Sequence, residues 1–152
     1  MEALDRVFRY LLTTKSHTFK LQPKAFAGTW EIKTYTDADY ADHTDSTEST
    51  SGLAIYLMGA LIAWESKRQK CTSLSTTESE YIVASNGSRK IQLISNFLDT
   101  TLGMPRSATL LCDNQSTIAS IKKTVVPSRL KHINVKFHHV KGNIKSGIHD
   151  IN

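Results

Sequence analysis

The sequence predicts one α/β domain built on a mixed sheet, because three strand patterns come first and helix and strand patterns then alternate. The expected order of elements is β-β-β-α-β-α-α. A chain of 152 residues, 39% hydrophobic and 22% charged, suits a single globular domain with a sizeable core. Acidic residues stand at the boundaries of three predicted elements, which is typical of a metal site at the edge of a sheet.

The N-terminal elements are predicted from hydrophobic spacing. Apolar residues near the start recur at helical intervals: Leu4, Val7, Phe8, Leu11 and Leu12. Residues 13–28 are polar, contain a proline and a glycine, and are predicted to be a linker. Residues 30–37 alternate as a strand does, with Trp30, Ile32 and Thr34 on one face.

A loop, a hairpin and a basic segment are expected next. Residues 41–51 are rich in Asp, Ser and Thr, which predicts a loop. Residues 51–58 and 61–64 are apolar and β-prone, and Gly59-Ala60 between them predicts a tight hairpin turn. Residues 66–70 are basic and are expected to be exposed.

A long helix is predicted from Ser75, because Ser75 and Glu78 have the spacing of a capping box. The helix should continue towards Gly103, with Pro105 just beyond its end. Asn86-Gly87 is expected to be a weak point in its middle.

The last elements are shorter. Residues 110–113 are predicted to form a buried strand and residues 114–121 a short helix. A final helix is expected over residues 132–145, with Gly142-Asn143 interrupting its later part.

The charge balance favours a polyanionic partner. The net charge is +5 and the pI is near 9.3. A basic run is usually a solvated surface, but beside a carboxylate site it becomes a set of candidate phosphate contacts: Lys67, Arg68 and Lys70.

Cysteine usage and hydropathy favour an intracellular protein with no membrane partner. Cys71 and Cys112 form no CxxC pair and are predicted to be reduced thiols. Residues 53–64 are the most apolar stretch, but they are too short for a membrane span and contain a glycine. Met1 is followed by acidic residues, so no signal peptide is expected.

Three carboxylates are candidate metal ligands: Asp37, Glu80 and Asp113. They follow the first strand, begin the long helix and follow the later strand. Carboxylates suit Mg²⁺ or Mn²⁺, and two such ions roughly 4 Å apart can activate a water and stabilise the leaving oxygen of a phosphodiester. Glu78 competes with Glu80, but the capping box already gives Glu78 a structural role. Asp113 also fits a helix N-cap, and both of its roles can coexist.

Other metals are weaker hypotheses. A calcium loop would take ligands from Asp37, Asp39, Asp45 and Glu48. Its sixth position is Asp42 where glycine is needed, and predicted strands flank it instead of helices. Zinc could be suggested by His132, His138, His139 and His149, but no cysteine pair or H-E-x-x-H motif accompanies them.

Several motifs follow one another in a fixed order: Tyr35-Thr36-Asp37-Ala38-Asp39, Ser49-Thr50-Ser51-Gly52, Trp64-Glu65-Ser66-Lys67-Arg68-Gln69, Ser75-Thr76-Thr77-Glu78-Ser79-Glu80-Tyr81, Cys112-Asp113-Asn114-Gln115-Ser116 and Ser128-Arg129-Leu130-Lys131-His132-Ile133. Together they resemble the RNase H domain of copia-type LTR retrotransposon polyproteins. The opening stretch, residues 6–12, is similar to the tail of the preceding reverse transcriptase region. The resemblance spans nearly the whole chain.

The resemblance implies an α/β RNase H-like fold over residues 30–152, with residues 1–29 as the reverse transcriptase tail and linker. It implies that Asp37, Glu80 and Asp113 bind Mg²⁺ or Mn²⁺ and that the chain hydrolyses the RNA strand of an RNA–DNA hybrid. The implied setting is a cytoplasmic retrotransposon particle, beside the reverse transcriptase portion of the same polyprotein. Further contacts to the hybrid would come from Ser75, Asn114 and Gln115.

The chain also departs from the family pattern. A fourth acidic residue in a later helix has no match, so the domain is expected to be C-terminally truncated, ending as its last strand should begin; Asp150 is not assigned to that role. The alternative function is therefore a catalytically impaired relic that only binds nucleic acid. An integrase-like transferase would carry its acids in the order Asp, Asp, Glu, whereas here the order is Asp, Glu, Asp.

Overall fold

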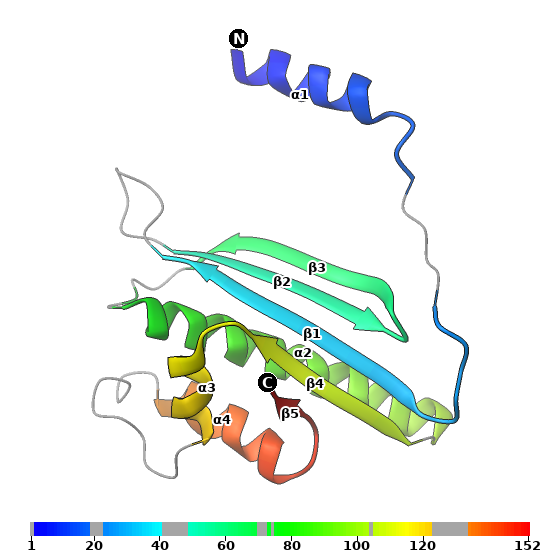
Figure 1. Ribbon diagram of the computed structural model, residues 1–152, viewed down its shortest axis with the longest axis vertical. Coiled ribbons are helices and arrows are strands. Elements are labelled where there is room, and N and C mark those ends of the chain that lie inside the picture. The colour runs from blue at the N-terminus through cyan, green and yellow to red at the C-terminus, as the bar shows by residue number, and fades with distance from the viewer. Residues whose placement is uncertain are drawn as a thin grey trace.

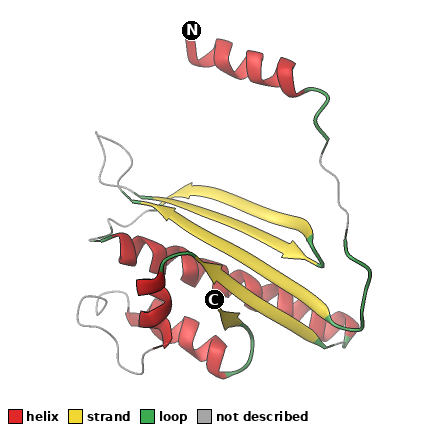
Figure 2. Cartoon of the chain, viewed as in Figure 1, coloured by secondary structure: helices red, strands yellow, loops and turns green. Residues whose placement is uncertain are grey.

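The computed structural model describes residues 2–18, 23–40, 49–69, 73, 75–103, 105–122 and 134–152. Figures 1 and 2 show the order of its helices and strands: α1 (Glu2–Thr14), β1 (Trp30–Asp39), β2 (Thr50–Leu57), β3 (Ala60–Arg68), α2 (Thr76–Leu102), β4 (Arg106–Cys112), α3 (Gln115–Lys122), α4 (Asn134–Lys145) and β5 (Asp150–Ile151). Some predicted features lie outside the described residues: Asp45, Glu48, Lys70, Cys71 and His132.

The predicted mixed α/β sheet is confirmed. Its strand order is β3-β2-β1-β4-β5. The pairs β1–β2 and β2–β3 are antiparallel, and the pairs β1–β4 and β4–β5 are parallel. The short strand β5 is the last element of the chain, at the place where the sequence predicted a final strand to begin.

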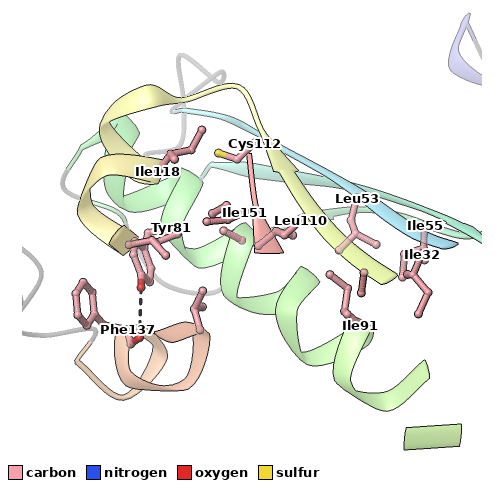
Figure 3. Close-up of a cluster of buried hydrophobic side chains, with 14 of the residues drawn as sticks. Ile32, Leu53, Ile55, Tyr81, Ile91, Leu110, Cys112, Ile118, Phe137 and Ile151 are labelled. Carbon is pink, nitrogen blue, oxygen red and sulfur yellow. Dashed lines mark hydrogen bonds between the residues drawn. The ribbon is translucent and has the colours of Figure 1, made fainter. Parts of the chain in front are cut away.

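Helices α2, α3 and α4 lie on one side of the sheet (Figure 1). The inward-facing residues Ile32 and Thr34 of β1 are fully buried, as the alternation predicted. Tyr81 of α2 stacks on Phe137 of α4, with 5.6 Å between the ring centroids. The Tyr81 hydroxyl donates to the Phe137 carbonyl at 3.4 Å (Figure 3). This core fixes α2 between the sheet and α4.

The hairpin turn lies one residue earlier than predicted. Met58 and Gly59 form it, with φ angles of 53° and 82°, and Ala60 already belongs to β3. A two-residue hairpin loop in a type I′ turn requires a positive φ angle at both of its residues. Strand β3 then continues to Arg68, beyond the predicted end at residue 64. Since β3 is an edge strand, its polar side chains can face solvent and do not end the strand. Gln69, expected to be exposed, is 5% exposed.

The predicted limits of α2 are confirmed. The Ser75 side chain accepts a hydrogen bond from the backbone N–H of Glu78 at 3.2 Å. At the other end Gly103 is left-handed, with φ 59°, and its N–H donates to the carbonyls of Leu98 and Asp99. Both ends therefore have partners for backbone groups that a helix leaves open.

The expected weak point at Gly87 is wrong. The helix is continuous there, and Gly87 is buried against the sheet. A Cβ at this position would lie 2.9 Å from the Leu110 Cδ1 atom and 2.9 Å from the Thr36 Cγ2 atom. Glycine is therefore the residue that lets α2 approach β1 and β4 so closely.

The interruption expected at Gly142-Asn143 is also wrong, because α4 runs through both residues. Asn143 is 5% exposed, and its Nδ2 donates to Ser88 Oγ at 2.9 Å. Ser88 Oγ lies 2.7 Å from His149 Nε2, and His149 Nδ1 lies 3.0 Å from the Asp150 carbonyl. Since a carbonyl only accepts, Nδ1 carries the proton and Nε2 accepts from Ser88. This buried network links α2, α4 and β5.

Among the helices that the structure describes, none combines the length and the apolar character needed to cross a bilayer.

Replacing Gly87 with alanine should destabilise the protein by about 1–3 kcal/mol, because the new Cβ overpacks the contact with Leu110 and Thr36. Gly142 on α4 is the matched control, since nothing lies within 4 Å of its Cβ position. Gly142→Ala should stabilise by about 0.5–1 kcal/mol through helix propensity. Urea unfolding of both variants measures the difference, and a stabilising Gly87→Ala would contradict the close packing.

The contribution of His149 to the stability of the protein should fall as the pH drops below about 6.5. Burial lowers the pKa of His149 from its ordinary value of 6.5, so the unfolded chain binds this proton more readily than the folded one. His149→Asn should remove this contribution, so that stability falls less steeply from pH 7.5 to pH 5 than in the wild type, and should cost about 1–3 kcal/mol at pH 8. The exposed His138, replaced by Gln, is the control for the removal of a histidine. An unaltered slope in His149→Asn, measured by denaturant unfolding, would refute the assignment.

Candidate active site

Two of the candidate acids lie side by side because β1 and β4 are parallel. The last residue pair of this ladder is Thr36 with Cys112, and Asp37 and Asp113 come next on their strands. Strand β1 runs on to Asp39, paired with β2, so Asp37 lies at the end of the β1–β4 ladder and not at the end of its strand as predicted. Both carboxylates are exposed and line one hollow over the sheet.

Asp113 does not cap the following helix, which corrects one of the two roles predicted for it. The N-cap is Asn114, whose Oδ1 accepts from the Thr117 N–H at 2.9 Å. The Asn114 carbonyl accepts from the Ile118 N–H at 3.0 Å. The carboxylate of Asp113 is therefore not committed to the cap.

Glu80 reaches the same place from α2. It is 5% exposed, and its Oε1 accepts from the backbone N–H of Ala38 at 3.1 Å. Its Oε2 lies 4.0 Å from the sulfur of Cys112. The side chain is thus fixed between β1 and the end of β4, whereas Glu78, also buried, stands at the cap of the helix.

The ligand atoms of Glu80, Cys112 and Asp113 all lie within 4.8 Å of one another. Asp37 is not part of that compact group, but its charge acts on Glu80. Burial, above all, and the neighbouring charges of Asp113 and Asp37 raise the pKa of Glu80 from 4.5 to about 7, although the Ala38 N–H opposes the shift. A carboxylate crowded in this way gains from a nearby cation.

The residues present fit a hard divalent cation. Burial raises the pKa of Cys112 to about 11, so its sulfur stays a thiol and is a poor ligand at neutral pH. The carboxylates of Glu80 and Asp113, with Asp37 beside them, are oxygen donors of the kind that Mg²⁺ and Mn²⁺ prefer. Cys112 was not predicted to lie at the site; its position just before Asp113 in an apolar strand was the available signal.

The residues predicted to contact nucleic acid are dispersed. Lys67 and Arg68 are exposed at the end of β3 and line a groove beside α2. Ser75 caps α2 and Asn114 caps α3, so both side chains have structural roles. Gln115 is exposed at the start of α3.

The fold and its acidic edge define an RNase H-like α/β domain. RNase H1 from Halobacterium salinarum superposes with a TM-score of 0.54 at 12% identity, covering 80% of this chain and 83% of that one. The PFV RNase H domain gives a TM-score of 0.53 at 16% identity, covering 82% and 79%. The predicted fold is confirmed.

The homologues of this chain are retrovirus-related Pol polyproteins from copia-type transposons, as the motifs predicted. The polyprotein from transposon RE1 of Arabidopsis thaliana is 36% identical over 149 residues, which cover 97% of this chain. The polyprotein from transposon TNT 1-94 of Nicotiana tabacum is 36% identical over 141 residues, which cover 92%. The chain spans 10% of the length of each. No family model matches the chain.

In metal-free buffer at pH 8, Glu80→Gln should stabilise the protein by about 1–2 kcal/mol. The raised pKa means that the folded state keeps a proton which the unfolded state loses between pH 4.5 and about 7, so the contribution of Glu80 to stability falls as the pH rises through this interval. The amide removes that cost and keeps an oxygen for the Ala38 N–H.

Thermal unfolding in EDTA measures this change. Glu65→Gln is the control, because its ion pair with Lys90, at 2.7 Å, lowers the pKa of Glu65 and its loss should give no stabilisation. If Glu80→Gln unfolds at a lower temperature than the wild type, the Glu80 carboxylate is not destabilised by burial and by the charges of Asp113 and Asp37.

Proposed function

We propose that this chain is a divalent-metal-dependent ribonuclease H, which hydrolyses the RNA strand of an RNA–DNA hybrid during retrotransposon reverse transcription. The observation that supports the proposal is that Glu80 and Asp113 lie together at one edge of the sheet, with Asp37 on the neighbouring strand close enough for its charge to act on Glu80. The Pol polyprotein homologues support the retrotransposon setting.

In this proposal Asp37, Glu80 and Asp113 hold Mg²⁺ or Mn²⁺. When bound there, the divalent metal would supply activation of a water and neutralisation of the leaving oxygen. Glu80 is oriented for this task by the Ala38 N–H, and its burial keeps bulk water from one side of the site. Asp113 and Asp37 face the open hollow, where a phosphodiester can approach.

The hybrid is bound through its backbone in this scheme. Lys67 and Arg68 stand at the end of the sheet where Asp37 lies, because Ser66 pairs with Gly52 and Gly52 pairs with Asp37. Arginine and lysine contacts to phosphate fix the register of a duplex, and 2′-hydroxyls identify the RNA strand. We further propose that residues 1–29 are the end of the reverse transcriptase region and its linker.

The purified chain should cleave only the RNA strand of a labelled hybrid, with Mg²⁺ or Mn²⁺ and not with EDTA. Asp37→Asn and Asp113→Asn should each reduce the rate at least about 100-fold, equivalent to about 2.7 kcal/mol of transition-state stabilisation. Asp99→Asn, far along α2, is the control for loss of one carboxylate. Gel electrophoresis of both labelled strands reads the result.

Absence of cleavage by the wild-type chain, with hybrid binding retained, would overturn the catalytic proposal and favour a nucleic-acid-binding relic. Cleavage that survives Asp37→Asn and Asp113→Asn would overturn the assignment of these residues.

A further inference from the structure

Strand β3 is an outer edge of the sheet, since the strand order places only β2 beside it. Figure 1 shows it as the outermost strand, and within the described part of the chain no strand pairs with its outer side. Its last five residues are Trp64-Glu65-Ser66-Lys67-Arg68. An edge strand can add another strand through the backbone N–H and C=O groups that face away from its neighbour.

The outward backbone groups of β3 belong to alternate residues. Gln69 is hydrogen-bonded to the β2 side, because its N–H donates to the Ser49 carbonyl at 2.8 Å. In an antiparallel ladder, hydrogen-bonded pairs alternate with pairs whose N–H and C=O groups point away from the partner strand. The N–H and C=O groups of Trp64, Ser66 and Arg68 therefore point to the outer side of β3.

The hairpin end of β3 is less suited to such pairing. The register of β3 against β2 shifts between Ile55 and Tyr56, which leaves Ile62 as an extra residue of β3. A bulge of this kind bends a strand and increases its twist. The regular part of the edge is therefore residues 63–68, where the Trp64 side chain is 68% exposed.

Charged residues on an edge strand ordinarily keep copies of a protein apart, because two identical antiparallel strands bring like charges together in most registers. A two-fold axis at Glu65 would place two carboxylates opposite each other, and an axis at Lys67 two ammonium groups. An axis at Trp64 would pair Ser66 with the bulged Ile62. An axis at Ser66 has none of these conflicts.

In the register with its axis at Ser66 the charges are complementary. Each Glu65 lies opposite the Lys67 of the second copy, and each Trp64 lies opposite the Arg68 of the second copy. Side chains directly opposite in a ladder are close enough for an ion pair and for a cation–π contact. The segment from Trp64 to Arg68 is thus self-complementary in charge as well as in its backbone groups.

We propose that residues 64–68 of β3 pair antiparallel with the same residues of a second copy of this chain, with the two-fold axis at Ser66. Two five-stranded sheets would then join into one through an isologous contact. The long helix leaves room for this, because α2 packs against β1 and β4, where Gly87 meets Thr36 and Leu110. Since the paired segment is short, the dimer belongs to the class of weak, transient complexes.

The dimer does not rest on the proposed nuclease function. Lys67 and Arg68 are also the proposed phosphate contacts, and they cannot bind a hybrid and a second copy at once. The paired state therefore belongs to the chain without nucleic acid, and its test uses protein alone.

Sedimentation velocity of the full chain, at concentrations up to about 1 mM, should show a dimer whose share rises with concentration. Lys67→Glu and Glu65→Lys should each weaken the dimer at least about tenfold, because like charges then face each other twice. An equimolar mixture of these two variants should associate again, since every charged pair of the mixed dimer is opposite in sign. Lys122→Glu, an equal charge reversal at an exposed position on α3, is the matched control and should leave the dimer unchanged.

The mixture separates register from net charge, because both variants keep a positive net charge and do not attract each other as whole molecules. Circular dichroism of each variant verifies that it is folded. A chain that stays monomeric at about 1 mM, a dimer insensitive to Lys67→Glu, or a mixture no stronger than its components would each overturn the proposal.

Cysteine cross-linking tests the position of the axis in a chain with Cys71→Ser. Ser66→Cys should form a disulfide-linked dimer under mild oxidation, because the two residues face each other across the axis. Ile62→Cys is the control, since the two copies of residue 62 would lie about 26 Å apart along the strands. Equally fast cross-linking of both variants would contradict the register. None of these readouts depends on cleavage, so failure of the nuclease proposal would leave the test of the dimer intact.

Discussion

The candidate site depends on the close packing of α2 against β1 and β4. Gly87 allows this close packing, because the Cβ of any other residue would lie 2.9 Å from side-chain atoms of Leu110 and Thr36. Glu80 lies seven residues earlier, two turns away on the same face of the helix. The approach of α2 at Gly87 therefore also brings the Glu80 carboxylate within hydrogen-bonding distance of the Ala38 N–H. A helix held further from the sheet would leave Glu80 short of the acids on the strands.

The candidate acids and the basic side chains of the groove lie on separate surfaces of the protein. Asp37, Glu80 and Asp113 gather where no described cation forms an ion pair with them, and burial and mutual repulsion raise the pKa of Glu80 as a result. The lysines and arginines that line the groove beside α2 belong to a surface that does not include the candidate acids, and they lie beside a carboxylate that Lys90 already engages. An arrangement that is unfavourable for the isolated chain is favourable for a complex in which cations and a polyanion join it.

The sequence predicted the features that local pattern encodes. The alternation in β1 identified the buried face, and Ser75 and Gly103 identified the ends of α2, because caps and strand faces depend on neighbouring residues alone. Asp37, Glu80 and Asp113 were predicted to be metal ligands because each stands near an element boundary. The structure brings Glu80 and Asp113 together, with Asp37 on the strand beside Asp113, and their role as ligands stays a prediction.

Features that depend on tertiary contact were not predictable in this way. Gly87 looked like a helix breaker. Glycine is needed there because a Cβ would lie too close to Leu110, which is distant in the sequence. Asn143 looked like an interruption of α4, yet it is a buried partner of Ser88. Whether Asp113 or Asn114 caps α3 depends on where β4 stops, and two adjacent residues with similar capping propensity cannot be separated by pattern.

The central claim is that carboxylates from β1, α2 and the end of β4 form one cation site. A crystal structure of the protein soaked with Mn²⁺, with anomalous data collected near the manganese edge, tests it most directly. The account predicts an anomalous peak bounded by the carboxylates of Glu80, Asp113 and Asp37. Manganese found only elsewhere, or a site bounded by histidines with Glu80 still bonded to Cys112 and Ala38 alone, would contradict it.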